Sequence, residues 1–470
     1  MYKQFKKKFT ENFLFLLLFL FIILSSLVFR INHNDFAYYT ISKIDFKFYS
    51  EYWPAQAPLS YFINNFLSKI FTSNYDYLIM RLFSIFYYIL SLVILSFSLK
   101  EKKKIIIFIL LSVTYASSIS YEIGNYTLAL FFFTISYFFY FEKKNSKVNF
   151  FLGSFFFGLC ISSKTLYCVL IFILIFSYKK TSNFKTLVIF STIGGLIGLL
   201  PIIFYLPFDL DKFLFWNFKL HLLFNEVNRF EGFEKYFLDL FVHFKKNYFP
   251  IMFLFLYFFF SSLNNLNLKI IKEFFILFFL FISGLVVFVV QRQYFEPFVI
   301  FCIYFLIKNL DYNKYKNLLF ATLVFGLVQY IFYNFTYYKE LNSQKNYFFV
   351  QNIKNYFEYK FSDKQNCKIT TRTSSGVYLP YNFIQHKHNP NGIWFYQLRN
   401  LDLRSYEKYL DIDYKNNFSL DYNRNEFNSI LVGHYRNDPM DNRLVEYAKS
   451  KKWKKYSYRD FDFYIDKNCL

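Results

Sequence analysis

A series of apolar blocks separated by short Lys-rich connections constrains this chain more than any other feature. The first block covers residues 13–29, and ten more follow it. A helix needs about 20 mainly apolar residues to cross a bilayer; several blocks are shorter, so their ends are approximate. The pattern predicts a mainly α fold, a polytopic membrane bundle of about eleven transmembrane helices. The later predicted helices cover approximately 77–99, 104–119, 126–141, 148–162, 165–178, 186–206, 249–264, 271–290, 297–308 and 317–337.

The positions of the lysines predict on which side of the membrane each connection lies. Short cytoplasmic connections of membrane proteins carry an excess of Lys and Arg. With a cytoplasmic N-terminus, the long segments 31–76 and 207–248 and the tail after about 338 all fall outside. We therefore expect a multi-pass protein of the cell (inner) membrane with an extracytoplasmic C-terminal domain. The lysines of the predicted cytoplasmic connections are Lys100, Lys102–Lys104, Lys143, Lys144, Lys147, Lys179, Lys180, Lys185, Lys269, Lys272, Lys308, Lys314 and Lys316.

The first apolar block and the net charge both fit a membrane protein. The block 13–29 has no small-x-small cleavage pattern before Arg30, so it is predicted to be an uncleaved signal-anchor helix. Basic residues outnumber acidic ones 54 to 32, a net charge of +22. Because the lysines lie between apolar blocks, they indicate helix orientation and do not suggest a nucleic-acid-binding face.

Five cysteines and scattered histidines show no metal-binding spacing. No CxxC pair occurs, which argues against a structural zinc site and leaves a divalent metal cofactor open. Cys160, Cys168 and Cys302 fall in apolar blocks and are interpreted as small buried residues. Cys367 and Cys469 lie in the predicted soluble tail, where they form either one disulfide in an oxidising compartment or two free thiols.

Two regions outside the apolar blocks carry structure of their own. In Leu59–Phe71, apolar residues recur at helical spacing opposite polar ones, which predicts an amphipathic helix on the membrane surface. The tail contains an expected strand at 429–435, a helix at 442–452 and a strand at 461–465. We therefore divide the chain into a transmembrane domain, 1–337, and a small C-terminal α/β domain, 338–470. No repeat, P-loop, GxGxxG or Ser-His-Asp signature is seen in the sequence.

Charged residues gather at the predicted outer ends of the helices. Asp35 follows the first helix, Glu122 lies in a short outer turn, and Lys164 and Arg292 lie at two further outer turns. One interpretation is plain: the acids are solvated at the water boundary and Arg292 snorkels. The other is functional: the acids deprotonate an acceptor and the bases hold an anionic lipid headgroup. These residues by themselves do not select a reaction.

The order of six short motifs narrows the choice. They are Asp35-Phe-Ala-Tyr38, Trp53-Pro-Ala-Gln-Ala-Pro-Leu-Ser-Tyr61, Tyr75-Asp-Tyr-Leu-Ile-Met-Arg-Leu-Phe-Ser84, Glu122-Ile-Gly-Asn-Tyr126, Gly158-Leu-Cys-Ile-Ser-Ser-Lys164 and Gln291-Arg-Gln-Tyr-Phe-Glu-Pro297. Over about residues 1–310 this order resembles the GT-C membrane glycosyltransferases, in particular bacterial relatives of the dolichyl-phosphate-mannose protein mannosyltransferases and of the lipid A aminoarabinose transferase. Phe36 and Gly124 depart from the Glu and Arg usual there, which argues against close kinship with the protein mannosyltransferases.

The resemblance implies an inverting transfer from a polyprenyl-phosphate-linked sugar to a lipid, glycan or protein acceptor. It implies that Asp35 is the general base and makes Lys164 and Arg292 candidates to bind the leaving phosphate. Glu122 would orient the acceptor or support this network. No residue is assigned as a metal ligand. Secondary candidates for contacting substrate are Tyr38, Tyr126, Tyr294 and His221, although His221 also suits a plain interfacial position.

Two other functions stay open at this stage. A lipid or polysaccharide transporter or flippase would place charged residues near the middle of the membrane, in repeated halves with broken helices. A surface-polysaccharide polymerase or ligase would use a large outer loop between late spans. The early position of Asp35 and the charges at the outer edge favour the glycosyltransferase.

Overall fold

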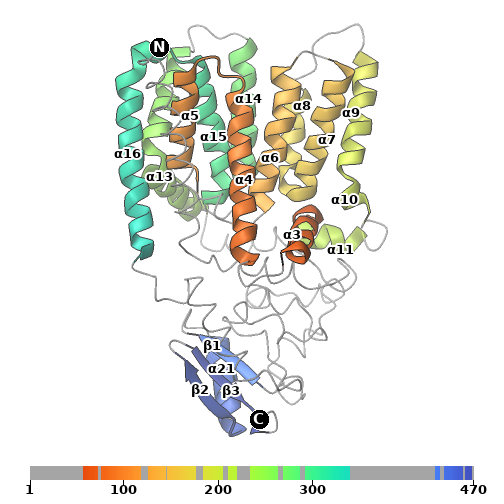
Figure 1. The fold of residues 1–470 in the computed structure, drawn as a ribbon, viewed down its shortest axis with the longest axis vertical. Coiled ribbons are helices and arrows are strands. Elements are labelled where there is room, and N and C mark those ends of the chain that lie inside the picture. Colours follow the sequence, from red (N-terminus) through yellow and green to blue (C-terminus); the bar gives the residue numbers. More distant parts are fainter. Residues whose placement is uncertain are drawn as a thin grey trace, which may run out of the picture. The chain divides into compact units, whose positions relative to one another are not determined.

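The computed structural model describes residues 57–71, 76–117, 125–143, 146–175, 184–204, 210–219, 233–262, 268–285, 292–338, 429–433, 439–458 and 461–467. These residues are mainly helical, with one small sheet near the C-terminus (Figure 1). The chain divides into two units. The first contains residues 1–29, 73–199 and 233–338, and the second contains residues 30–72, 200–232 and 339–470. The prediction of a mainly α chain with a small C-terminal α/β region is confirmed at this level.

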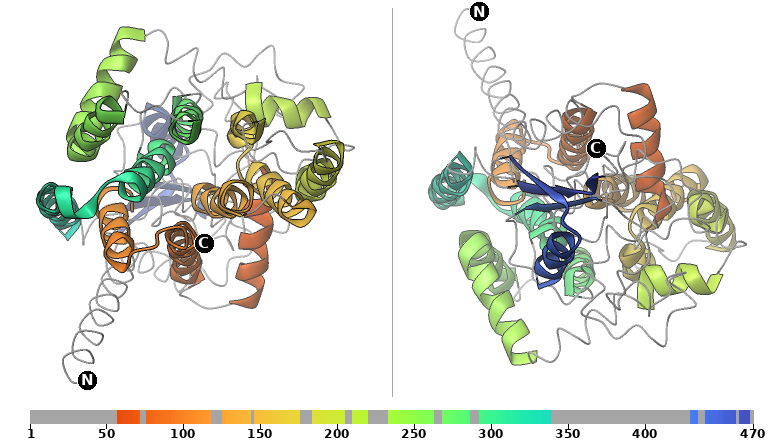
Figure 2. Two further views of the ribbon diagram at one scale, coloured as in Figure 1. Left: turned by 90° about the horizontal axis from the view of Figure 1, so that it is seen from above. Right: turned by 90° about the horizontal axis from the view of Figure 1, so that it is seen from below.

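The helices of the first unit follow the predicted apolar blocks. They lie side by side in Figure 1 and are seen nearly end-on in Figure 2. Each predicted block from 77–99 onward contains a helix. The helices of this unit are α4 (Asp76–Ser96), α5 (Lys102–Tyr115), α6 (Asn125–Tyr137) with its π-helical continuation η2 (Phe138–Glu142), α7 (Lys147–Ser163), the 3-10 helix η3 (Thr165–Leu170), α8 (Ile171–Ile175), α9 (Phe184–Gly198), α13 (Phe233–Ser262), α14 (Leu268–Leu285), α15 (Arg292–Asn309) and α16 (Tyr312–Tyr338).

One helix begins well before its predicted span. Helix α13 begins at Phe233, inside the predicted outer segment 207–248, and continues without a break to Ser262, within the predicted span 249–264. The apolar block starts later because Lys245 and Lys246 interrupt it. An apolar block marks where a helix becomes hydrophobic, and the hydrogen-bonded helix extends beyond that point.

Among the described helices, two are long and apolar enough to cross a membrane by themselves. The qualifying stretches are Ile79–Ser96 in α4 and Tyr312–Phe332 in α16. Lys147–Ser163 and Lys185–Gly198 form shorter apolar helices. A buried helix of a soluble protein can also meet these criteria of length and composition. The bundle of about eleven spans therefore stays a prediction.

Contacts near the helix ends give the relative directions of three helices. At the starts of α6 and α15, the ring centroids of Tyr126 and Tyr294 are 5.2 Å apart. At their other ends, the Tyr304 hydroxyl donates to Glu142 at 3.0 Å. The two helices are therefore parallel. Lys164 at the end of α7 reaches Tyr126, so α7 runs antiparallel to α6. The predicted in–out alternation requires these relative directions.

Helix α15 forms the centre of the first unit. Every side chain from Phe295 to Ile307 is buried. It packs against α5, α13 and α14, and its Phe301 ring also contacts Phe133 of α6. Apart from Glu296 and the Tyr304 hydroxyl, this stretch is apolar on all sides, as expected for a helix in an interior.

Glycines let α7 and α9 approach closely. A Cβ at Gly158 of α7 would lie 2.6 Å from the carbonyl oxygen of Gly195, and one at Gly198 of α9 would overlap the carbonyl oxygen of Phe155. Ser162 of α7 donates to the Gly198 carbonyl at 3.0 Å. Small residues spaced four apart are typical of close helix pairs in membranes, where backbones pack directly.

The outward faces of α13 and α16 are strongly apolar. Phe332 of α16 is 71% exposed and Phe241 of α13 is 65% exposed. Soluble monomers rarely leave apolar surface of this extent open to water. The exposed apolar residues of the two helices are Phe237, Leu238, Phe241, Val242, Phe249, Phe253, Leu256, Tyr257, Phe260, Leu318, Phe320, Val324, Phe325, Val328, Ile331 and Phe332.

The second unit contains the predicted amphipathic helix. Helix α3 covers Pro58–Ile70, as expected for the stretch 59–71, and begins with a proline, whose missing N–H is harmless there. Its apolar residues Phe66 and Ile70 are exposed, whereas Ser60 and Ser68 are buried. An outward apolar face is what the predicted surface helix needs. The unit also contains α10 (Leu200–Ile203), α11 (Leu210–Leu214) and η4 (Phe215–Lys219).

The C-terminal part of the second unit is a small α/β element. Strands β1 (Ser429–Gly433) and β3 (Phe461–Ile465) and helix α21 (Pro439–Ser450) confirm the three predicted elements. Strand β2 (Lys454–Tyr458) was not predicted; it pairs antiparallel with β3, as β1 does, and gives a three-stranded sheet in the order β1-β3-β2. Lys454 and Lys455 make the start of this strand polar, so its sequence does not resemble a strand. In the structure, Lys455 pairs with Asp462 of β3 at 2.9 Å. The core here is Ile430, Leu444, Ala448 and Tyr464.

Candidate functional site

Four of the eight predicted site residues lie in the described part of the chain. Tyr126, Lys164, Arg292 and Tyr294 all belong to the first unit. Asp35, Tyr38, Glu122 and His221 lie outside the described residues, as do Cys367 and Cys469. Of the remaining cysteines, Cys160 and Cys302 are buried as expected, Cys168 is partly buried, and all three are free.

Lys164 occupies the junction between α7 and η3. Its N–H donates to the Cys160 carbonyl at 2.9 Å, and its own carbonyl accepts from Tyr167 at 3.0 Å. Its backbone is extended, with φ −148° and ψ 102°, so the α-helix stops here and the chain continues as a 3-10 turn. The side chain is only 3% exposed. The sequence placed Lys164 at an outer turn, and the structure adds that it is buried.

The ammonium of Lys164 rests on an aromatic pair that joins two distant motifs. Its Nζ lies 4.3 Å from the centre of the Tyr126 ring, a cation–π contact. The Tyr126 ring meets Tyr294 edge to face, with an interplanar angle of 73°. The pair brings together residues that lie far apart in the sequence, from α6, α7 and α15.

Arg292 begins α15, two residues before Tyr294. Its guanidinium donates to Oδ1 of Asn247 in α13. Asn247 is buried, and its Nδ2 donates to the carbonyl of His243 at 2.9 Å and lies 3.2 Å from Nδ1 of the same residue. His243 lies in the part of α13 that precedes the predicted span. Burial, then Arg292 and Lys246, lower the pKa of His243 to about 4, so the imidazole is neutral at pH 7.

Further polar side chains are buried at the same helix ends. Glu296 of α15 and Thr127 of α6 have no exposed surface, and Arg81 of α4 is 2% exposed. Arg81 belongs to the third motif, yet the sequence gave no reason to assign it a role. The Tyr87 ring of α4 packs on Phe131 of α6, which puts Arg81 near the level of the first turn of α6. Two arginines and a lysine are thus placed toward one end of the unit.

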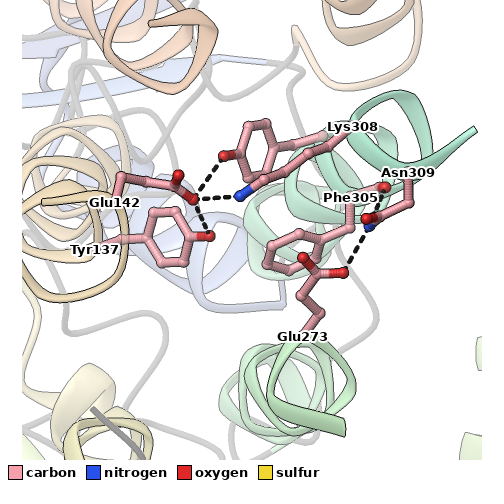
Figure 3. Close-up of polar contacts among 7 residues, drawn as sticks. Tyr137, Glu142, Glu273, Phe305, Lys308 and Asn309 are labelled. Carbon is pink, nitrogen blue, oxygen red and sulfur yellow. Dashed lines mark hydrogen bonds and ion pairs between the residues drawn. The ribbon is translucent and has the colours of Figure 1, made fainter. Parts of the chain in front are cut away.

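The opposite end holds a polar cluster that the sequence reading did not identify. Oε1 of Glu142 accepts from Tyr137 at 2.8 Å, from Tyr304 at 3.0 Å and from the Lys308 ammonium (Figure 3). Beside it, Glu273 of α14 accepts from Asn309 of α15 at 2.6 Å. The two contacts tie the ends of α6, α14 and α15 together.

The charges of Glu142 and Lys308 in this second cluster neutralise each other. Burial raises the pKa of Glu142, which lies just beyond the predicted span 126–141, but Lys308 and the tyrosine hydroxyls outweigh it. The net pKa is therefore below the ordinary 4.5. Glu142 and Lys308 are 16% and 17% exposed, so this ion pair is largely shielded from water. We interpret this ion pair as a structural contact that holds the helices together.

Metal chemistry receives no support from the described residues, which contain no group of three His, Cys, Asp or Glu side chains able to hold an ion. The sequence matches no protein-family model. No curated protein is significantly similar to it in sequence.

Proposed function

We propose that this chain is a multi-pass membrane glycosyltransferase, inverting, with a polyprenyl-phosphate-linked sugar donor and a lipid, glycan or protein acceptor on the outer face of the cell membrane. The observation that carries the proposal is the buried Lys164 ammonium, joined through Tyr126 and Tyr294 to the start of α15, where Arg292 lies. Fixed cations away from bulk water stabilise an oxyanion more strongly than solvated ones.

The chemistry requires such cations because the leaving group is a lipid phosphate. The acceptor hydroxyl loses its proton to Asp35 and attacks the anomeric carbon, and the bond to the phosphate oxygen breaks. Lys164 and Arg292 would stabilise the charge that builds on that oxygen. The Arg292 fork can bind two phosphate oxygens at once, and Lys164 adds a point charge.

The membrane part of the proposal rests on the first unit. The outward faces of α13 and α16 are apolar over several turns. The helix directions fit an arrangement with Lys308 and Lys143 on the cytoplasmic side and Lys164 and Arg292 on the outer side. We propose that the remaining apolar helices of this unit cross the bilayer together with α4 and α16, with tilt and flanking residues compensating for their length.

A transfer assay on the purified full-length protein tests the function. The protein would receive a panel of labelled polyprenyl-phosphate sugars, and transfer of the label would be measured. Asp35→Asn should lower turnover about a hundredfold or more, the usual contribution of a general base, while Asp45→Asn should match the wild type. Equal turnover in all three proteins would remove Asp35 from the mechanism.

The same preparation separates the enzyme from its main alternative. Reconstituted in vesicles, a transporter or flippase would move the labelled lipid between leaflets and leave the sugar bound to it. Movement without transfer for every donor of the panel would reject the glycosyltransferase proposal.

A further inference from the structure

Arg292 is held by a chain of hydrogen bonds that leads to a histidine. The guanidinium donates to Oδ1 of Asn247, and Nδ2 of Asn247 faces His243, one helical turn earlier in α13. The imidazole is enclosed by rings, with centroids 6.1 Å from Phe244, 5.6 Å from Tyr248 and 6.2 Å from Phe295. None of these residues belongs to the motifs that carried the resemblance, apart from Arg292 and Phe295.

This chain of contacts fixes which nitrogen of His243 carries the proton. A guanidinium can only donate, so the atom of Asn247 that faces Arg292 must be the oxygen. The amide nitrogen then faces His243, and because it donates, Nδ1 must be the acceptor. A neutral imidazole with an accepting Nδ1 carries its proton on Nε2. Within the described part of the chain, this buried Nε2 has no hydrogen-bond partner.

We infer that His243 binds the phosphate group of the lipid donor by donating its Nε2 proton to a phosphate oxygen next to Arg292. The inference deepens the proposed function and depends on it. A buried donor without an acceptor costs about 1–3 kcal/mol, and a ligand oxygen would remove this cost.

The charges around His243 favour an anionic ligand over a sugar hydroxyl. Arg292 and Lys246 are the two cations whose charges lower the pKa of the imidazole. Their positive potential attracts a phosphate, and a neutral imidazole adds a hydrogen bond without adding a third positive charge to desolvate. The Nε2 atom itself is buried, and a hydrogen bond is stronger away from bulk water.

Binding of farnesyl phosphate to the purified full-length protein in detergent tests this inference, with farnesol as the neutral control. His243→Phe keeps a ring but has no donor, and it should weaken farnesyl phosphate binding about tenfold to a hundredfold, the range for a hydrogen bond to a charged group. His243→Gln, whose amide N–H can take the place of Nε2–H, should restore most of the affinity. Asp239→Asn, an exposed change one turn earlier in α13, should leave it unchanged.

The outcomes separate this inference from the proposed function. Wild-type affinity in His243→Phe together with weakened binding in Arg292→Ala would overturn the role of His243 and leave the phosphate site standing. Wild-type affinity in His243→Phe, Arg292→Ala and Lys164→Met would overturn both. Equal loss in His243→Phe and His243→Gln would show that the ring only supports the fold, and would also overturn the inference.

A spectroscopic measurement keeps the question open to refutation even if the Phe variant does not fold. The chain has six histidines, so protein labelled with ¹⁵N-histidine gives few signals, and the signal missing from His243→Gln belongs to His243. Its shifts should report a proton on Nε2 at pH 7 and should move when farnesyl phosphate is added. Shifts that stay constant at saturating ligand would overturn the inference.

Discussion

Replacing Lys164 by methionine should separate ligand binding from folding. Methionine has nearly the same length and is apolar, so it can fill a site in which the native side chain is only 3% exposed. The cation–π contact with Tyr126, at 4.3 Å, is worth about 2 kcal/mol when desolvated, and it is lost. The desolvation penalty of a buried ion, several kcal/mol, is removed at the same time. The free energy of unfolding of Lys164→Met should therefore stay the same or rise.

Binding should change in the opposite direction. A hydrogen bond between the ammonium and a phosphate oxygen contributes about 1.5–3 kcal/mol, which corresponds to about a tenfold to hundredfold increase in Kd for farnesyl phosphate. Tyr126→Phe keeps the ring under Lys164 and should change the Kd by less than about threefold, since only the hydroxyl is removed.

Two measurements on the same detergent preparation check the reasoning. Thermal unfolding, monitored by circular dichroism, gives the change in free energy of unfolding. Titration with farnesyl phosphate gives the Kd. Lys245→Met is the matched control, because Lys245 is exposed on α13. If Lys164→Met is strongly destabilised and binds farnesyl phosphate as tightly as the wild type, Lys164 is a structural cation and its proposed role is wrong.

Three further changes test the fold and its orientation. Gly198→Ala should destabilise the protein by about 1–3 kcal/mol, because the new Cβ would overlap α7. Gly195→Ala should be neutral or stabilising, because its Cβ would have its nearest neighbour at 3.9 Å. Equal melting temperatures for the two variants would contradict the α7–α9 packing. Because the pKa of Glu142 is lowered on folding, its contribution to stability is present above pH 4.5 and is lost as the pH falls through the folded pKa. The stability difference between wild type and Glu142→Gln should therefore shrink below pH 4.5, and a difference that does not depend on pH would reject the ion pair. In intact cells a membrane-impermeant thiol reagent should label Asn400→Cys and not Lys102→Cys, both made in a cysteine-free background, and the reverse pattern would invert the topology.

The sequence predicted the helices of the first unit well because apolar blocks and helices coincide in such a bundle. It did less well where helix and apolar block differ in length. Helix α13 begins at Phe233, and the charged residues before 249 made this part resemble a loop. Strand β2 was missed for a related reason, since Lys454 and Lys455 give a polar start to a short strand. Local pairing, here Lys455 with Asp462, stabilises it.

Packing between helices is where the sequence alone reached its limit. The spacing of Gly194 and Gly198 is visible in the sequence, but its partner in α7 is not, because nothing local says that α7 and α9 are neighbours and parallel. The sequence also gives no local sign of the cluster at Glu142. Glu142 and Lys308 are far apart in the chain and meet only because α6 and α15 are parallel with matched ends.

The candidate site contains residues that sequence motifs predict and residues that only the fold brings to it. Lys164, Tyr126 and Tyr294 belong to three separate sequence motifs, and the structure joins them in one series of contacts. Asn247 and His243 were not selected, because their spacing of four residues acquires meaning only once the segment before 249 is helical and one face of it meets the start of α15. At the other end of the same helix, the Lys308 ammonium is neutralised by Glu142. The ammonium of Lys164 lies on the Tyr126 ring, and the guanidinium of Arg292 donates to the Asn247 amide oxygen. Both cations lie near the start of α15, the end of the unit at which we propose that the donor phosphate binds.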